Sequence, residues 1–453
     1  AHRRLPFRSD ARVGSFLMGA PRPLSIGMDY GTSHCSAGHA DGNGVRLLPM
    51  GEGRTLVASL LWAPSVSFEL GFDAQGCIRS DDARFQALAF GDDALQRYLD
   101  APERGYYVKS PKSFLGAPGL LPQVRERFVR LVGAMMLNVR LHAEEALGQS
   151  VTAAVVGRPV NFQGPQGSVE NDTALAMLTQ AATLAGFEAV DFLFEPLAAA
   201  LEYEARLNAE QRVLVVDIGG GTTDCSFVIV GPDRSARLDR GQDVLGHSGE
   251  RLGGNDYDQA LALLAAVPEL GWQAERRRGL PVPNHYFVDA ISINDVNAQA
   301  RFYGASTGER LEVLAQELRD PGPFERFLRL RDQRGSYRLL RGIEQAKIGL
   351  SEAAETSLNL GYLEPSLTIP VTRDALLAAS ETLLEHLASS VSEALAQGES
   401  APDVVYLTGG MAQSPIVRDH LNRLLDGLPV LDSDHFASVT EGLSLHAARR
   451  FAA

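Results

Sequence analysis

Two segments of the chain, 188 positions apart, share one pattern: an apolar strand, an aspartate, a glycine-rich turn and a second strand. The first reads SIGMDYGTSHCS and contains Asp29; the second reads VLVVDIGGGTTDCS and contains Asp217. Such a turn exposes backbone N–H groups, and Gly, Thr and Ser let phosphate oxygens approach them closely. Two copies predict two lobes that face each other across a cleft and hold a polyphosphate from both sides.

The segments around these turns alternate between buried strands and helices, which predicts an α/β fold with mostly parallel sheets. We expect strand–turn–strand units at 25–50 and 212–230. The other expected elements are helix 124–148, strand 151–160, helix 171–186, strand 187–196, helix 197–207, a short strand pair at 359–371, helix 373–397, and a strand, turn and helix at 403–417.

The chain divides by composition into two lobes and one insertion. Residues 1–24 are basic and unpatterned and predict a flexible tail, followed by lobe I at 25–208 and lobe II at 209–453. Within lobe II, residues 255–358 contain many charged residues and mostly helical periodicity, with few strand signals, which predicts a separate helix-rich subdomain.

The charge balance and the cysteines limit the classes of partner. A net charge of -14 over 453 residues repels phosphate backbones and anionic lipid, so neither nucleic acid nor membrane is an expected partner. The three cysteines show no metal-binding spacing, and no apolar run is long enough to span a membrane. With no apolar secretory signal at the start, we expect a cytoplasmic protein.

Each glycine-rich turn begins with an aspartate at the end of a strand. Carboxylates in these positions would repel phosphate unless a cation lies between them, so Asp29 and Asp217 predict a hydrated magnesium ion. The GxxxxGK[ST] pattern of P-loop proteins is absent, which excludes that class of nucleotide fold.

These blocks resemble the ATPase domain of the heat shock protein 70 (Hsp70) family, most closely its short YegD-type members. The resemblance rests on IGMDYGTSHCS, VVDIGGGTTDCSFV, FLFEPLAAALEYE, RLGGNDYDQAL, IEQAKIGLSEAAE and YLTGGMAQSPIV, which occur in the family's order between about residues 25 and 445. It implies an actin-like ATPase fold of two duplicated lobes, with mixed sheets on either side of a nucleotide cleft, that binds ATP or ADP with Mg²⁺, with K⁺ as a further candidate ion.

The resemblance also implies roles for individual residues. Nucleotide contacts are expected from Gly31, Thr32, Ser33, His34, Gly219, Gly220, Gly221, Thr222, Gly253, Gly254, Glu344, Lys347, Ile348, Gly409, Gly410 and Met411. Metal contacts are expected from Asp29, Asp217 and Asp224, and catalytic roles from Lys112, Glu195 and Asp217.

Two of the catalytic candidates have alternatives. Lys112, in KSFLG, would neutralise charge on the transferred phosphoryl group, with Lys109 as the alternative lysine. Glu195 would orient an attacking water, although an acid at that position also stabilises the start of a helix through the macrodipole.

The adenosine contacts depart from the family pattern. Glu344 and Lys347 lie one helical turn apart and match a ribose- and base-contacting pair, although a surface ion pair explains the same spacing. Ile348 stands where the family has an arginine that stacks on adenine, and Met411 and Gln413 replace a Ser and an Arg. The base could therefore sit in an apolar slot between Ile348 and Met411, or base preference is relaxed.

Three functions remain open at this point. The first is an ATPase switch or chaperone that lacks a peptide-binding domain and acts on an unknown client or co-chaperone, with 255–340 as the candidate contact surface. Its turnover of ATP would be slow. The others are a small-molecule kinase and a scaffold that binds ATP without catalysis.

Overall fold

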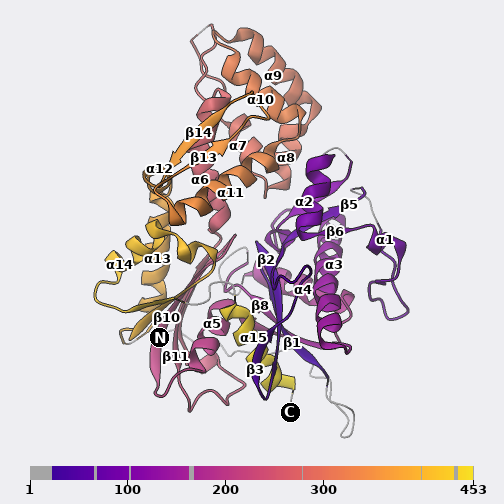
Figure 1. Cartoon of the computed structure of the whole chain (residues 1–453), viewed down its shortest axis with the longest axis vertical. Coiled ribbons are helices and arrows are strands. Elements are labelled where there is room, and N and C mark those ends of the chain that lie inside the picture. Colours follow the sequence, from indigo (N-terminus) through magenta and orange to yellow (C-terminus); the bar gives the residue numbers. More distant parts are fainter. Residues whose placement is uncertain are drawn as a thin grey trace.

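The computed structural model describes residues 23–65, 69–101, 104–162, 168–277, 279–398, 400–432 and 437–451. Nearly all of the tail predicted at 1–24 lies outside these residues. Figure 1 shows two lobes side by side, with a group of helices extending above one of them. No described helix is both long and apolar enough to cross a membrane.

Each lobe is built on a sheet with the same strand order. The order is β3-β2-β1-β8-β9 in the first lobe, where β4 also pairs with β2, and β12-β11-β10-β15-β16 in the second. The strands of the first sheet are β1 (Ser25–Tyr30), β2 (His34–Asp41), β3 (Gly44–Leu47), β4 (Val57–Ala58), β8 (Ala153–Arg158) and β9 (Ala189–Phe194). Those of the second are β10 (Gln211–Ile218), β11 (Thr223–Val230), β12 (Val244–Glu250), β15 (Val404–Thr408) and β16 (Val430–Asp432).

The strand directions repeat as well. In each sheet an antiparallel hairpin, β1–β2 or β10–β11, pairs on one side with a third antiparallel strand. On the other side it pairs with one parallel strand, β8 or β15, which in turn pairs with a second, β9 or β16. This repeat confirms the predicted duplication and the actin-like α/β fold. The mixed sheets that the family resemblance implies are confirmed, whereas the expectation of mostly parallel sheets, drawn from the alternation of strands and helices alone, is wrong, because both glycine-rich turns join antiparallel neighbours.

Helices cover both faces of the central strands, which explains why β8 and β10 are almost wholly buried and have apolar residues along their middle parts. In the first lobe, α3 (Pro122–Leu147) and α4 (Val169–Leu184) pack together on the outer side. Between the two sheets lie α5 (Glu195–Glu204) and α15 (Ser438–Phe451), which contact each other closely (Figure 1). A Cβ atom on Gly442 would fall 1.8 Å from the carbonyl oxygen of Ala198, so only glycine permits this crossing.

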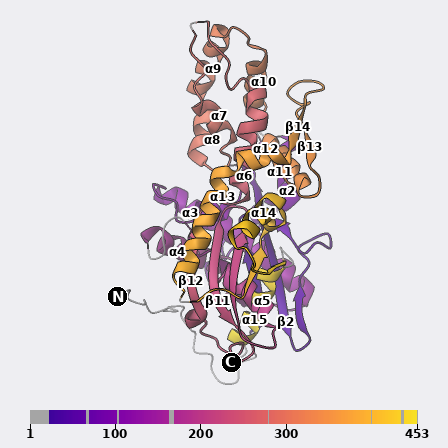
Figure 2. The ribbon, with the colours of Figure 1, turned by 90° about the vertical axis from the view of Figure 1, so that its left-hand side faces the viewer.

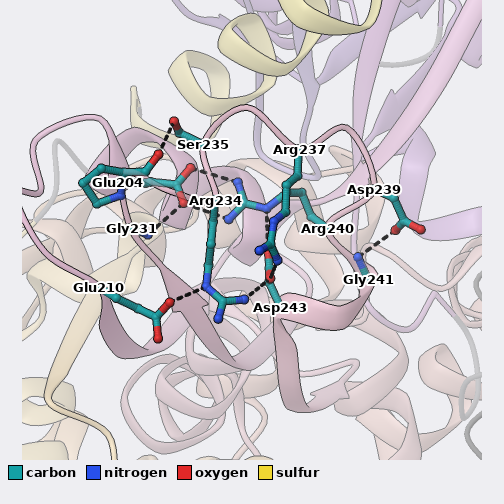
Figure 3. A network of polar contacts seen from close by, with 11 residues as sticks. Glu204, Glu210, Gly231, Arg234, Ser235, Arg237, Asp239, Arg240, Gly241 and Asp243 are labelled. Carbon is teal, nitrogen blue, oxygen red and sulfur yellow. Dashed lines mark hydrogen bonds and ion pairs between the residues drawn. The ribbon is translucent and has the colours of Figure 1, made fainter.

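The C-terminal end of α5 is anchored by a group of charged residues around a buried core, which we call the base cluster: Glu204, Arg234, Arg237, Arg240 and Asp243 (Figure 3). Arg240 donates two hydrogen bonds of 2.8 Å to the Glu204 carboxylate and one of 2.6 Å to Asp243. Arg234 and Arg237 also donate to Asp243. The loop between β11 and β12 is thereby tied to α5.

The predicted helix-rich region at 255–358 is present and forms the upper part of Figure 2. Phe287, Phe302, Phe324 and Phe327 pack within it, with ring centroids 4.4–6.3 Å apart. Its elements are α6 (Gly254–Leu261), α7 (His285–Ile291), α8 (Val296–Tyr303), α9 (Ala305–Glu317), α10 (Gly322–Asp332), α11 (Ser336–Glu352) and the first strand of the hairpin β13 (Glu355–Asn359) and β14 (Thr368–Thr372). Its status as a separate subdomain stays a prediction.

Several boundaries differ from those expected. The predicted helix 373–397 is two helices, α12 (Arg373–Ala379) and α13 (Glu381–Ala396), because the backbone at Ser380 (φ -99°, ψ 3°) leaves the helical region. Helix α4 starts earlier than expected, since the Ser168 side chain caps it, and it ends before Gly186. The expected strand, turn and helix at 403–417 are β15, a 3₁₀ turn and α14 (Pro415–Leu424).

A small three-stranded sheet forms the arm of the first lobe that faces the helix-rich region. Its strands are β5 (Leu60–Ala63), β6 (Ala89–Phe90) and β7 (Tyr106–Lys109), and they pack with α2 (Gly91–Asp100). The chain leaves β7 into a 3₁₀ turn at Pro111–Phe114, which contains Lys112. The short helix α1 (Ala83–Gln86) lies before β6 in the same region.

Candidate functional site

The two glycine-rich turns have the same backbone geometry. In the first turn the N–H of Gly31 donates to the carbonyl of His34 over 3.0 Å, and in the second Gly219 donates to Thr222 over 2.9 Å. The matching bond closes both hairpins at the same place. The predicted repeat is therefore a repeat of structure at the cleft itself.

The two turns face each other at van der Waals distance. A Cβ atom on Gly220 would lie 1.8 Å from the Ser33 hydroxyl oxygen, and one on Gly221 would lie 2.7 Å from Thr32 Cγ2. A side chain at either glycine would therefore require Ser33 or Thr32 of the first turn to move. The close approach of the first turn thus favours glycine in the second.

The segment at Gly253 and Gly254 packs against the second turn. Gly254 N–H donates to the Gly219 carbonyl over 2.9 Å, while a Cβ atom on Gly253 would lie 2.6 Å from the Gly221 nitrogen. Gly409 has a φ of +84°, and a Cβ there would meet the Ile218 carbonyl at 2.4 Å. The structure therefore gathers these predicted glycines around one turn, and Gly410 begins the 3₁₀ turn at Gly410–Gln413 that follows.

Lys112 and Glu195 form a buried ion pair. Lys112 Nζ lies 2.5 Å from Glu195 Oε1, and the two side chains are 5% and 11% exposed. Glu195 follows β9 directly and is the first residue of α5, which therefore starts two residues before the expected helix at 197–207. Both roles considered for Glu195, a cleft carboxylate and a helix-start acid, are compatible with this position.

Three aspartates surround this pair. Asp29 is the one partly exposed residue of β1, between the buried Met28 and Tyr30, and Asp217 and Asp224 are direct cross-strand partners in β10 and β11. Asp224 Oδ1 also accepts a 2.7 Å hydrogen bond from the N–H of Val160, which lies after β8 in the other lobe. The acids predicted as metal contacts thus lie at the junction of the two lobes.

This site holds more negative charge than it can balance. Burial, and then the Glu195 carboxylate, raises the pKa of Asp29 to about 7 and that of Asp224 to about 7. The same causes raise the pKa of Asp217 well above its usual range. Burial alone would lower the pKa of Lys112, but Glu195 and Asp29 outweigh it and raise that pKa. Raised carboxyl pKa values are typical of a site that lacks positive charge.

A divalent cation fits this donor set. Among the residues that the structure describes, no group of three or more His, Cys, Asp or Glu side chains is arranged to hold a metal ion directly. Carboxylates that share a site without converging on one point suit a cation that keeps most of its water shell, as Mg²⁺ does. Asp29, Asp217 and Asp224 are the residues that would face it.

The predicted adenosine pair is split between two sets of partners. Lys347 Nζ lies 2.8 Å from Asp258 Oδ1 and donates to the Gly254 carbonyl over 2.8 Å. Glu344 instead accepts a 2.7 Å hydrogen bond from Arg341 and lies 3.9 Å from Lys109 across the cleft. The alternative of a surface ion pair between Glu344 and Lys347 is therefore wrong.

The other adenosine candidates differ in exposure. Ile348 is 53% exposed and free to meet a ligand, whereas Met411 is only 4% exposed and lies beside Gly254. Because one side chain is exposed and the other is buried, these positions do not support the expected apolar slot for adenine between Ile348 and Met411. Lys109, the alternative to Lys112 as the phosphate-contacting lysine, lies at the mouth of the cleft, whereas Lys112 contacts Glu195.

A cavity opens between the first turn and the helix-rich region. It is bordered by Ser33 and His34 of the turn, and burial lowers the pKa of His34. Its other lining residues are Ala58, Leu60, Asp92, Leu95, Tyr107, Lys109, Ile293, Tyr337, Arg341 and Glu344. The rings of Tyr107 and Tyr337 pack edge to face with their centroids 4.9 Å apart. The arm of the first lobe therefore contacts the helix-rich region at the mouth of the cleft.

Comparison with known proteins agrees with this architecture. Residues 126–267 match the family model described as Hsp70 protein. The chain is 25% identical to the chaperone protein DnaK of Elusimicrobium minutum (strain Pei191) over 407 residues, which cover 87% of this chain and 53% of that protein. It is 24% identical to DnaK of Thermosipho melanesiensis over 443 residues, covering 95% of this chain and 60% of that protein.

A third relative aligns over a shorter region with higher identity. Chaperone protein dnaK3 of Synechococcus elongatus is 30% identical over 322 residues, which cover 68% of this chain and 34% of that protein. The paired sheets, the facing turns and these matches agree. The chain contains an ATPase domain of the Hsp70 family. It spans about half the length of the curated Hsp70 relatives first matched.

Sequence reasoning missed several residues of this Hsp70-type site. Asp258, the partner of Lys347, is part of the block RLGGNDYDQAL. It lies three residues after Asn255 on α6, and this spacing could have placed both residues on the helix face that contacts the second glycine-rich turn. Ser59 lies outside every motif, and Ser110 follows Lys109 without matching a motif position, so nothing in the sequence marks either residue. Their contacts are made mainly to and by backbone atoms, which the sequence does not display.

Proposed function

We propose that this domain binds Mg²⁺–ATP between its two turns, hydrolyses it slowly, and uses the resulting lobe movement to act on a protein partner. The observation that supports this most directly is the Lys112–Glu195 pair, buried among three aspartates where the two turns meet. A buried lysine among carboxylates is poised to contact a phosphoryl group that brings further negative charge.

Each residue has a role in this proposal. The backbone amides of the two turns bind the phosphates, as nests of N–H groups do elsewhere. Lys112 donates to the phosphoryl oxygen at which negative charge develops, and Glu195 accepts a hydrogen bond from the attacking water and orients it. Asp29, Asp217 and Asp224 hold the water shell of magnesium, which when bound neutralises phosphate charge.

The wider role rests on the relatives, which are named as chaperones. We place this protein with the YegD-type members as a chaperone-like ATPase in the cytoplasm, whose client or co-chaperone contacts the helix-rich region. Tyr107 and Tyr337 join the first lobe to that region at the cleft mouth. Opening and closing of the cleft would therefore move the proposed contact surface.

ATP turnover by the purified protein tests the proposal. We expect slow hydrolysis that Lys112→Ala and Glu195→Ala each reduce about a hundredfold. Lys109→Ala is the matched control, because Lys109 lies at the cleft mouth 3.9 Å from Glu344, and its loss should reduce turnover far less. Turnover that survives both Lys112→Ala and Glu195→Ala would overturn the catalytic assignment.

Nucleotide binding has a separate test. Thermal-shift titration with Mg²⁺–ATP should stabilise the wild type, and Asp217→Asn should weaken the response about tenfold in ATP concentration. An identical response from mutant and wild type would contradict the role of Asp217.

A further inference from the structure

Ser59 stands where the chain passes from one sheet of the first lobe to another. It is the single residue between β4, which pairs with β2 of the first hairpin, and β5, which pairs with β7. Its side chain is 1% exposed. A residue placed here can contact the phosphate-binding turn on one side and the segment that leads to Lys112 on the other.

On the first side, Ser59 holds two carbonyl groups of the turn. Its hydroxyl donates to the Gly31 carbonyl over 2.7 Å, and its N–H donates to the Ser33 carbonyl over 2.8 Å. In a trans peptide the C=O and the following N–H point in opposite directions. Fixing the Gly31 carbonyl on Ser59 therefore turns the N–H of Thr32 away from Ser59, as a phosphate-binding amide requires.

On the second side, Ser59 holds the approach to Lys112. Its carbonyl accepts a 2.8 Å hydrogen bond from the N–H of Ser110. Ser110 is 1% exposed and has left-handed backbone angles, φ 55° and ψ 58°, a conformation that is strained for a residue with a side chain. The surrounding structure must pay for that conformation, and the bond to Ser59 is one of its contacts.

We propose that Ser59 is a positioning residue that sets the first phosphate turn and Lys112 in register for the same phosphoryl group. This inference rests on the proposed function, since it assumes that both elements contact ATP. The hydroxyl of Ser59 orients the turn, and its backbone fixes the distance from the turn to the segment of Lys112. Ser59 itself does not contact the nucleotide.

The test compares Ser59→Ala and Ser59→Thr with Ser390→Ala. Ser390 is a matched control because it is also 1% exposed, lies in α13 away from the turns, and has a hydroxyl with no hydrogen-bond partner among the described residues. Each variant is examined for Mg²⁺–ATP affinity, adenosine affinity, kcat, KM and melting temperature. Adenosine lacks phosphates, so its binding reports on the pocket and not on the turn.

We expect Ser59→Ala to weaken Mg²⁺–ATP binding about tenfold, because the Gly31 carbonyl loses its buried donor, while adenosine affinity stays at the wild-type level. Ser59→Thr keeps the hydroxyl and should restore much of the loss, and Ser390→Ala should match the wild type. Equal losses for ATP and adenosine, or no loss in Ser59→Ala, would overturn the inference while leaving ATP turnover by the wild type intact. A wild type that binds no Mg²⁺–ATP would instead overturn the proposed function and this inference with it.

Discussion

The two ends of α5 carry buried ionic clusters of opposite character. At its C-terminal end, the base cluster surrounds Glu204 and Asp243 with three arginines (Figure 3), and the carboxylates outweigh burial to raise the pKa of Arg240. At its N-terminal end, what we call the cleft cluster (Asp29, Lys112, Glu195, Asp217 and Asp224) sets four carboxylates against Lys112, with the largely buried Arg158 as a further cation that acts on Asp224 and Glu195.

The difference shows how to separate structural charge from functional charge. Buried charges that supply their own partners can stay ionised without help, and removing one partner is costly. Buried charges that lack partners change their pKa or wait for a ligand. The base cluster is complete within the chain, whereas the cleft cluster would be completed by a cation and a phosphate.

The largest expected effect comes from opening the complete cluster. Arg240→Ala should lower the free energy of unfolding by about 3–5 kcal/mol, because Glu204 and Asp243 would stay buried with too few partners. Urea denaturation measures this loss. Arg301→Ala, which removes a more exposed arginine from its pair with Asp289, is the control and should cost far less. Equal losses would remove the distinction drawn for the base cluster.

Removing the lysine of the incomplete cluster should affect activity before stability. Lys112→Met keeps the length of the side chain and removes its charge, and we expect kcat to fall about a hundredfold. The free energy of unfolding should change less than in Arg240→Ala, because the carboxylates can take up protons as their pKa values rise further. Chemical denaturation and single-turnover kinetics on the same preparation test both parts; a stability loss equal to that of Arg240→Ala would contradict them.

The cleft cluster also predicts a dependence on pH. The pKa values of Asp29 and Asp224 rise from 3.8 to about 7 on folding, so between these values the folded protein holds protons that the unfolded chain has released. The stability of the metal-free protein should therefore fall as pH rises through this window. Mg²⁺ should raise the melting temperature about twice as much at pH 8 as at pH 5, and Asp224→Asn should reduce that difference.

The smallest effect concerns the nucleotide base, which lies outside both clusters. Ile348→Arg restores a cation that can stack on adenine, and it should tighten ATP binding about threefold with no loss of folding, since Ile348 is 53% exposed. Val313→Arg, on an equally exposed apolar residue of α9, controls for added charge. Calorimetry measures the affinity of each variant for ATP and for GTP. A change in affinity that is the same for both nucleotides, or the same in Val313→Arg, would contradict stacking on adenine.

The sequence predicted the parts of the site that are built from local patterns. The turn at Asp29, the turn at Asp217 and the block around Glu195 have signatures within a few residues, and the structure brings them together. The split of the Glu344–Lys347 pair could not be predicted, because Asp258 and Lys109 reach it through tertiary packing. The division of lobes and the catalytic roles stay predictions.

The same limit explains the errors in the fold. A break at Ser380 leaves the apolar periodicity of 373–397 almost unchanged, so periodicity alone favoured one helix. The base cluster was invisible for a different reason: Arg240 is in a loop, and only its position against the end of α5 distinguishes it from a solvated arginine.

The crossing of α15 has a consequence for how the chain matures on the ribosome. This helix, at Ser438–Phe451, packs on β1, β2 and β8, whose residues are synthesised about 300–400 positions earlier. Domains generally fold in order of emergence, but here the part of the first sheet that α15 covers, beside α5, stays uncovered until almost all of the second lobe has been made. Until then the nascent protein exposes an apolar sheet surface, so it would itself need protection from aggregation during translation.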